Sequence, residues 1–173
     1  VTYFSPLADT SLPDAGFVYL PGGYPELYLA ALSANRQMLQ SIRRYVESGG
    51  KLLAECGGMM YLCDEIRDKN GYVYPMAGVL HQSATMENMK LRLGYRTLLY
   101  NETRLKGHEF HYSRLVEQQN PLPSCAVAYT AKGVETDTPL YHYKNVWAGY
   151  THLYWADPVG NEWFTKFVID GNI

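Results

Sequence analysis

Short apolar runs, turns and one amphipathic pattern alternate in the first third of the chain. Residues 17–20 (FVYL) form an apolar run that ends in a Pro-Gly-Gly turn at 21–23, and residues 51–55 (KLLAE) contain a second run. Such runs are typical of buried strands in a parallel sheet. Between them, Pro25 opens a short helix and Asn35 is a suitable N-cap for a longer one. The apolar positions of that longer helix share one face: Met38, Leu39, Ile42, Tyr45 and Val46.

This order of strand, helix and strand predicts a right-handed βαβ unit whose loops lie at the carboxyl edge of the sheet and face one crevice. From residue 71 to 141 the pattern changes to short strands between turns, which favours antiparallel pairing: residues 72–74, 98–100, 110–112 and 126–129. Residues 146–152 then read as a final strand, and residues 161–168 as a terminal helix. With no internal repeat, the chain is expected to form a single α/β domain over residues 1–173.

Composition narrows the classes of function. Fifteen Lys and Arg against seventeen Asp and Glu give a net charge of −2 without any basic block, so the chain is not expected to bind nucleic acid. Three cysteines and no signal-peptide pattern disfavour a secreted disulfide framework and favour a cytoplasmic protein. No apolar run approaches the roughly 20 residues of a membrane span. A small neutral substrate best fits this nearly neutral charge.

The strongest chemical signal surrounds Cys56. Residues 54–58 read AECGG, and small residues around a nucleophile are what a tight turn between a strand and a helix requires. Such a turn places Cys56 at the amino end of a helix that begins near Gly58, where free N–H groups are expected to favour the thiolate. The alternative is a buried structural cysteine, the usual environment of a free Cys. Cys63, two helical turns further on, is expected in the core.

The Pro-Gly-Gly turn supplies a possible second part of a catalytic site. Acyl transfer requires backbone N–H donors directed at the developing oxyanion, and glycine allows the backbone to come close. We assign these donors to Gly22 or Gly23 in this turn and to Gly57 after the cysteine. Taken alone, the Pro-Gly-Gly sequence indicates only a turn.

Five histidines compete for the role of base, and their pattern alone does not select one: His81, His108, His111, His142 and His152. His152 ends a predicted strand and is favoured because that strand end could share the carboxyl edge with Cys56, whereas His81 and His142 are expected in loops. His108 and His111 form an H-x-x-H pair, but neither cysteines at metal spacing nor a clear helix supports a zinc site. We therefore expect no metal site.

Four stretches together resemble the C-terminal glutamine amidotransferase domain of the cobyrinic (hydrogenobyrinic) acid a,c-diamide synthases: residues 19–27 (YLPGGYPEL), 54–62 (AECGGMMYL), 107–113 (GHEFHYS) and 149–153 (GYTHL). The resemblance covers nearly the whole chain. It implies a class I glutamine amidotransferase fold, a three-layer α/β sandwich with flavodoxin-like layering around a mostly parallel sheet. It also implies that Cys56 attacks the side-chain amide of glutamine while His152 takes the thiol proton, so that a glutamyl thioester forms and ammonia leaves.

In such synthases, the resemblance implies, ammonia reaches an N-terminal ATP-dependent synthetase domain that uses ATP and Mg²⁺. That domain activates the a- and c-acetate carboxylates of a corrin substrate in vitamin B12 biosynthesis. The present chain contains no P-loop motif, so no cofactor is expected in this domain. It is expected to be a fragment without the synthetase domain and without the first strand and helix, which leaves a sheet edge available for a homo-oligomer.

One position departs from the family pattern. Most class I domains carry a Glu two residues after the catalytic His, where this chain has Tyr154, so the residue that orients His152 is not identified by the sequence. Two other readings stay open. One is a cysteine hydrolase on the same fold, and the other is a domain that binds a partner or the corrin without using Cys56.

Overall fold

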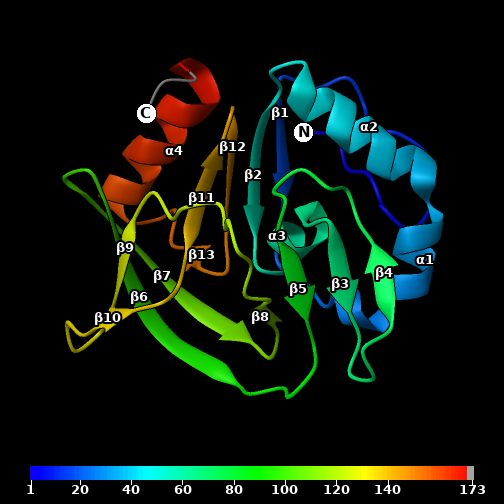
Figure 1. The fold of residues 1–173 in the computed structure, drawn as a ribbon. Helices are drawn as coiled ribbons and strands as arrows, with labels where there is room; N and C mark the ends of the chain where they lie inside the picture. Colours follow the sequence, from blue (N-terminus) through cyan, green and yellow to red (C-terminus); the bar gives the residue numbers. More distant parts are fainter. Residues whose placement is uncertain (171–173) are drawn as a thin grey trace.

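The computed structural model describes residues 1–170, and a four-stranded sheet lies at its centre (Figure 1). The strand order is β1-β2-β12-β11, where β1 is Phe17–Leu20, β2 is Lys51–Glu55, β12 is Val146–Gly149 and β11 is Leu140–Tyr143. β1 and β12 both run parallel to β2, and only β11 is antiparallel to its neighbour. The two strands expected from the apolar runs are therefore confirmed, and they are adjacent.

Helices cover one face of this central sheet. They are the 3₁₀ helix η1 (Pro25–Leu27), α1 (Leu29–Ala34), α2 (Arg36–Glu47) and α3 (Gly57–Leu62). Asn35 caps α2 as expected, because its side-chain oxygen accepts a hydrogen bond from the backbone N–H of Met38 at 3.3 Å. The buried residues of α2 are Met38, Leu39, Ile42 and Val46, which pack in one core with Val18, Leu52 and Ala148 of the sheet.

The opposite face of the central sheet packs against α4 (Pro158–Asp170) and a second, antiparallel sheet. The order of that sheet is β10 (Glu135–Thr136), β9 (Val127–Thr130), β6 (Arg92–Tyr100), β7 (Thr103–His111) and β13 (His152–Leu153). Leu53 and Trp147 of the central sheet share a core with Leu98 of β6 and Phe167 of α4. A three-layer α/β arrangement with a mostly parallel middle sheet, as expected from the sequence, is thus confirmed.

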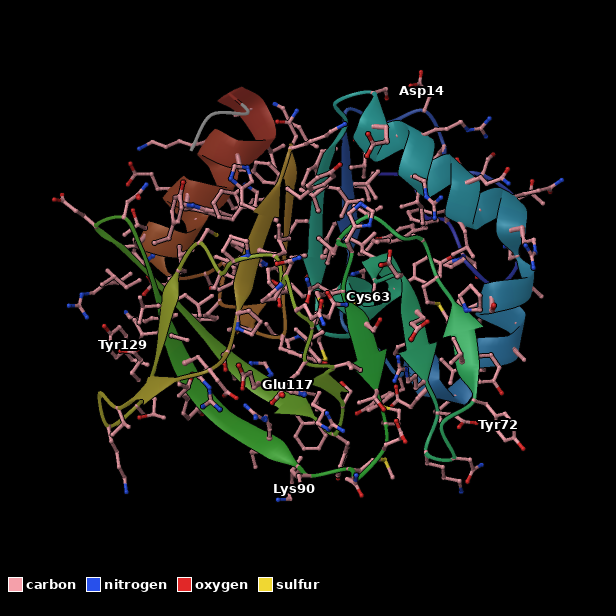
Figure 2. All side chains as sticks on the ribbon, viewed as in Figure 1. Asp14, Cys63, Tyr72, Lys90, Glu117 and Tyr129 are labelled. Carbon is pink, nitrogen blue, oxygen red and sulfur yellow. The ribbon has the colours of Figure 1, made fainter. Side chains whose placement is uncertain are left out.

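A third sheet extends the helical side of the molecule. Its order is β4 (Val73–Pro75), β3 (Glu65–Arg67), β5 (Ser83–Thr85) and β8 (Arg114–Leu115). Side chains fill the space between these strands and α3, and Cys63, labelled near the centre of Figure 2, is fully buried there. Cys63 is a core residue, as expected. Among residues 1–170, no helix combines the length and apolar character needed to cross a bilayer.

The expectation of one strand over residues 146–152 is wrong. β12 ends at Gly149, whose carbonyl oxygen accepts a hydrogen bond from the N–H of Cys56 at 2.8 Å. The chain then changes sheets, and His152 pairs with His108 of β7. His142 also differs from its expected place in a loop, since it lies in β11 with its ring stacked on Trp147 at 4.2 Å between centroids. Both differences arise from long-range pairing that local sequence patterns do not encode.

Candidate active site

Cys56 occupies a strained turn between β2 and α3. Its backbone has φ 49° and ψ −109°, in the positive-φ region that residues other than glycine rarely adopt. Neighbouring hydrogen bonds hold this conformation: the N–H of Cys56 donates to Gly149 O, and its carbonyl accepts from the N–H of Met60 at 3.0 Å. Strain of this kind costs about 1–3 kcal/mol and is concentrated at functional sites. The turn at Cys56 therefore matches the nucleophile elbow expected from the sequence.

Burial controls the protonation of the Cys56 thiol. Cys56 is only 5% exposed, and this desolvation raises the pKa of its thiol to about 11, although the backbone N–H of Gly57 favours the thiolate. Nearby carboxylates, Glu26, Glu109 and Glu55, raise the pKa further. The N–H of Gly57 acts in the direction expected for a helix terminus, but burial outweighs it, so the thiol stays protonated at neutral pH. A nucleophilic Cys56 needs a base to remove its proton.

The turn at residues 21–23 lies against both the elbow and His152. A Cβ placed on Gly22 would lie 2.1 Å from Cε1 of His152, so the imidazole ring packs directly on the Gly22 backbone. A Cβ on Gly57 would lie 2.4 Å from the carbonyl oxygen of Gly23. Both approaches exclude any larger residue without movement. By contrast, a Cβ on Gly23 would meet no atom within 4 Å. The sequence-predicted residues Gly22, Gly57 and His152 are thus brought together by one turn.

His152 begins β13 and is half-buried at the edge of the second sheet. Its ring stacks on that of His108, with centroids 5.0 Å apart. Burial lowers the pKa of His152, and the neighbouring His108 and His111 lower it further, while Glu109 acts in the opposite direction. His152 is therefore neutral at pH 7, the state in which an imidazole accepts a proton.

β7 lies beside both Cys56 and His152. Cys56 Sγ lies 4.0 Å from the carbonyl oxygen of Phe110, and His108, two residues earlier on β7, is the strand partner of His152. His108 and His111 do not form one ligand set, because His108 is exposed and His111 is buried on opposite faces of the strand. No group of three or more potential metal-ligating side chains occurs within residues 1–170.

Two buried glutamates, which sequence reasoning missed, contact the residues on either side of His152. Glu109 is fully buried, lies 2.9 Å from Arg96 and accepts a hydrogen bond from Thr151 Oγ1 at 3.5 Å. Glu55 accepts one from the N–H of Leu153 at 3.0 Å. Both glutamates are buried, although charged side chains are mostly exposed in proteins. The alternation of β7 could have placed Glu109 beside His111, but no local signal distinguishes Glu55.

A polar hollow of about 550 Å³ borders this region on the side of His111 and Tyr150. Arg92 and Arg114 line it together with Gln82, a residue 1% exposed. A larger, mostly apolar hollow of about 900 Å³ lies between the N-terminal residues, β1 and α4, and reaches the elbow only through Gly23, Gly57 and Gly58. Neither of these two hollows is lined by Cys56 or His152, and the larger one is lined by Gly23 and Gly57, two of the proposed oxyanion residues.

Comparison with known proteins identifies the family of this domain. The model of the CobB/CobQ-like glutamine amidotransferase domain matches residues 1–159. The hydrogenobyrinate a,c-diamide synthase of Pseudomonas aeruginosa is 38% identical over 159 residues, which cover 89% of this chain and 35% of the relative. The cobyrinate a,c-diamide synthase of Fusobacterium nucleatum is 39% identical over 162 residues, again 89% of this chain and 35% of the relative. The chain thus spans about a third of the length of these relatives.

Solved structures agree on the fold. A crystal structure of a glutamine amidotransferase superposes with a TM-score of 0.58 and 18% identity, covering 88% of this chain and 78% of the other. The PurLQS structure from Thermotoga maritima gives a TM-score of 0.53 at 15% identity, covering 84% of this chain and 72% of the other. At these identities the likeness establishes the fold alone, and the chemistry has to be argued from the site.

Proposed function

The chain belongs to the family of CobB/CobQ-like glutamine amidotransferase domains, and from this premise we propose that Cys56 and His152 hydrolyse glutamine to glutamate and ammonia. The observation that carries the proposal is the meeting of three segments. The elbow at Cys56, the turn at Gly22 and the strand start at His152 are distant in sequence, yet Gly22 packs on the His152 ring and Gly23 packs on Gly57.

In the resting site the thiol of Cys56 holds its proton and the imidazole of His152 is free to accept one. In the proposed reaction, His152 takes the thiol proton of Cys56 as Sγ attacks the side-chain amide carbon of glutamine. The tetrahedral intermediate collapses with cleavage of the C–N bond, and the protonated His152 returns its proton to the leaving nitrogen, which departs as ammonia. Water then attacks the glutamyl thioester with His152 as base, which releases glutamate and restores the thiol. Because the pKa of Cys56 is raised and that of His152 is lowered, proton transfer before the attack is unfavourable, and the proton is proposed to move as Sγ bonds to the amide carbon.

The oxyanion of the intermediate requires donors, and we propose the backbone N–H groups of Gly57 and of Gly22 or Gly23. Gly57 follows the nucleophile directly, and its N–H already acts on the Cys56 sulfur. The open space around the Cα of Gly23 leaves room for a substrate beside the turn. Cys56, Gly57 and Gly23 would thus contact the same substrate carbonyl.

For the longer protein we propose that this ammonia amidates the a- and c-acetate side chains of cobyrinic or hydrogenobyrinic acid, in keeping with the names of the relatives. The chain contains no P-loop motif, so ATP and Mg²⁺ would be bound by an N-terminal synthetase part outside these residues. Glutamine is the substrate proposed for this domain, the corrin belongs to the synthetase part, and a cytoplasmic location fits this pathway.

A measurement of glutamate release from glutamine tests the proposal. Cys56→Ser and His152→Ala are each expected to lower kcat by at least about 10³-fold, because nucleophile and base act as a unit. Cys125→Ser and His81→Ala serve as matched controls. Cys125 is partly buried against the core between the central and second sheets, and His81 is an exposed residue paired with Asp64. Unchanged turnover in Cys56→Ser would remove Cys56 from the reaction and favour a domain that only binds a partner or the corrin.

A further inference from the structure

The base at His152 lacks a carboxylate at the position where Tyr154 stands. The side chain of Tyr154 is 60% exposed, and its backbone N–H donates to the carbonyl of Lys106 at 2.8 Å. The backbone of Tyr154 therefore extends the pairing of β13 with β7, and its exposed side chain does not replace the missing carboxylate. An imidazole that is to accept a proton in a fixed geometry still needs its backbone held in place.

Glu55 accepts a hydrogen bond from the backbone of Leu153, the residue that follows His152. The carboxylate is 3% exposed, and its Oε1 accepts from the N–H of Leu153 at 3.0 Å. Its second oxygen, Oε2, accepts from the Tyr19 hydroxyl at 2.6 Å. Both oxygens of this buried carboxylate are therefore satisfied, as a buried charge requires.

The three residues that this carboxylate links, Glu55, Leu153 and Tyr19, belong to three different strands. Glu55 is the last residue of β2 and precedes Cys56 directly. Leu153 follows His152, and Tyr19 lies on β1, just before the turn at 21–23 that packs on the His152 ring. One side chain thus joins the strand that carries the nucleophile, the strand that carries the base and the strand that leads to the glycine turn.

On the basis of the proposed glutaminase reaction, we propose that Glu55 is a positioning residue that fixes His152 relative to Cys56 through the backbone of Leu153. It does not touch the substrate. Glu55 acts on the backbone next to the base, in place of a carboxylate that would bind the imidazole ring itself. Its removal leaves the buried N–H of Leu153 without an acceptor and frees β13 to move against β2.

Three substitutions at position 55 separate this role from a general effect of burial. Glu55→Ala removes the acceptor, and Glu55→Asp keeps the charge but shortens the side chain by one methylene, so that it no longer reaches Leu153. Both variants are expected to lower kcat for glutamine hydrolysis about 10- to 100-fold, with KM changed less than about threefold. Glu55→Gln keeps an oxygen for the Leu153 N–H and is expected to recover most of the lost kcat.

Glu47→Ala is the matched control. Glu47 also accepts a hydrogen bond from a tyrosine hydroxyl, that of Tyr143 at 3.2 Å, but it lies at the end of α2, outside the site. Its loss is expected to leave kcat unchanged. Melting temperatures of all variants identify any that fails to fold. If Glu55→Ala is unfolded, Glu55→Asp and Glu55→Gln decide the question.

NMR titration of the His152 imidazole provides a readout that does not depend on glutamine. In Glu55→Ala and Glu55→Asp the loosened ring gains water, so its pKa is expected to rise towards the ordinary imidazole value, while Glu55→Gln stays near wild type. Folded Glu55→Ala and Glu55→Asp proteins with wild-type kcat and an unchanged His152 titration would overturn the proposal. If wild type fails to hydrolyse glutamine, the proposed function fails, and the titration alone still decides the role of Glu55.

Discussion

At the scale of single residues, the proposed nucleophile is protonated and the proposed base is neutral. Burial raises the pKa of Cys56 to about 11 and lowers that of His152, so the pair rests as thiol and imidazole at neutral pH. This differs from a site that stores a thiolate beside an imidazolium. Reactivity then depends on proton transfer between two groups whose positions are set by glycines and by Glu55.

The pH dependence of glutamine hydrolysis follows from the His152 shift. A base is active only when deprotonated, and a lowered pKa keeps it deprotonated to lower pH. The acid limb of kcat/KM is therefore expected to have its midpoint below the ordinary imidazole value of about 6.5, with activity lost only as the pH falls through that midpoint. A rate profile from pH 4 to 9 checks this, and an acid limb centred above about 7 would contradict the assigned state of His152.

The contact between Gly22 and the imidazole gives a sharper prediction. In Gly22→Ala the new methyl group would lie 2.1 Å from His152 Cε1, so the ring or the turn must move. Displacement of a base by about 1 Å can cost about 10²-fold in rate, and a decrease of kcat of about 10- to 100-fold is expected. Gly16→Ala is the control, since a Cβ there meets no atom within 4 Å. Equal kcat in both variants would show that Gly22 does not hold the ring.

At the scale of elements, the sequence predicts local structure well and sheet changes poorly. β1, β2 and α2 follow from apolar runs and from the cap at Asn35, all of which are local signals. β13 does not, because its existence depends on pairing of His152 with His108 on a distant strand. The same limit applies to the site. Cys56 and the glycines could be predicted from spacing, whereas Glu55 could not, because its donors come from β1 and β13.

The stability of the packing between the central sheet and the second sheet is expected to depend on Trp147. This residue of β12 is 1% exposed, and its ring contacts Tyr100 of β6 and Trp163 of α4 in edge-to-face arrangements. Trp147→Ala is expected to lower the free energy of unfolding by about 3–5 kcal/mol, as is typical of a large side chain lost from a core. Urea unfolding measures this, with the exposed Tyr72→Ala as control. A loss below about 1 kcal/mol would contradict the assigned packing.

At the scale of the whole molecule, the layers bring the site together. Cys56 leaves the carboxyl end of a parallel strand in the middle sheet, and His152 enters from the edge of the antiparallel sheet packed against it (Figure 1). The proposed nucleophile and the proposed base therefore come from different sheets, and their geometry depends on how those sheets pack. The relatives extend well beyond the part that this chain matches, which is 35% of each.

The central claim is that Cys56 is a glutamine-directed nucleophile activated by His152. The most direct test is treatment of the protein with 6-diazo-5-oxo-norleucine, a glutamine analogue that alkylates an activated nucleophile, followed by mass-spectrometric mapping of the adduct. The account predicts modification confined to Cys56, prevented by excess glutamine and lost in His152→Ala. Absence of any adduct on Cys56, or equal labelling of Cys56 and the half-buried Cys125, would contradict it.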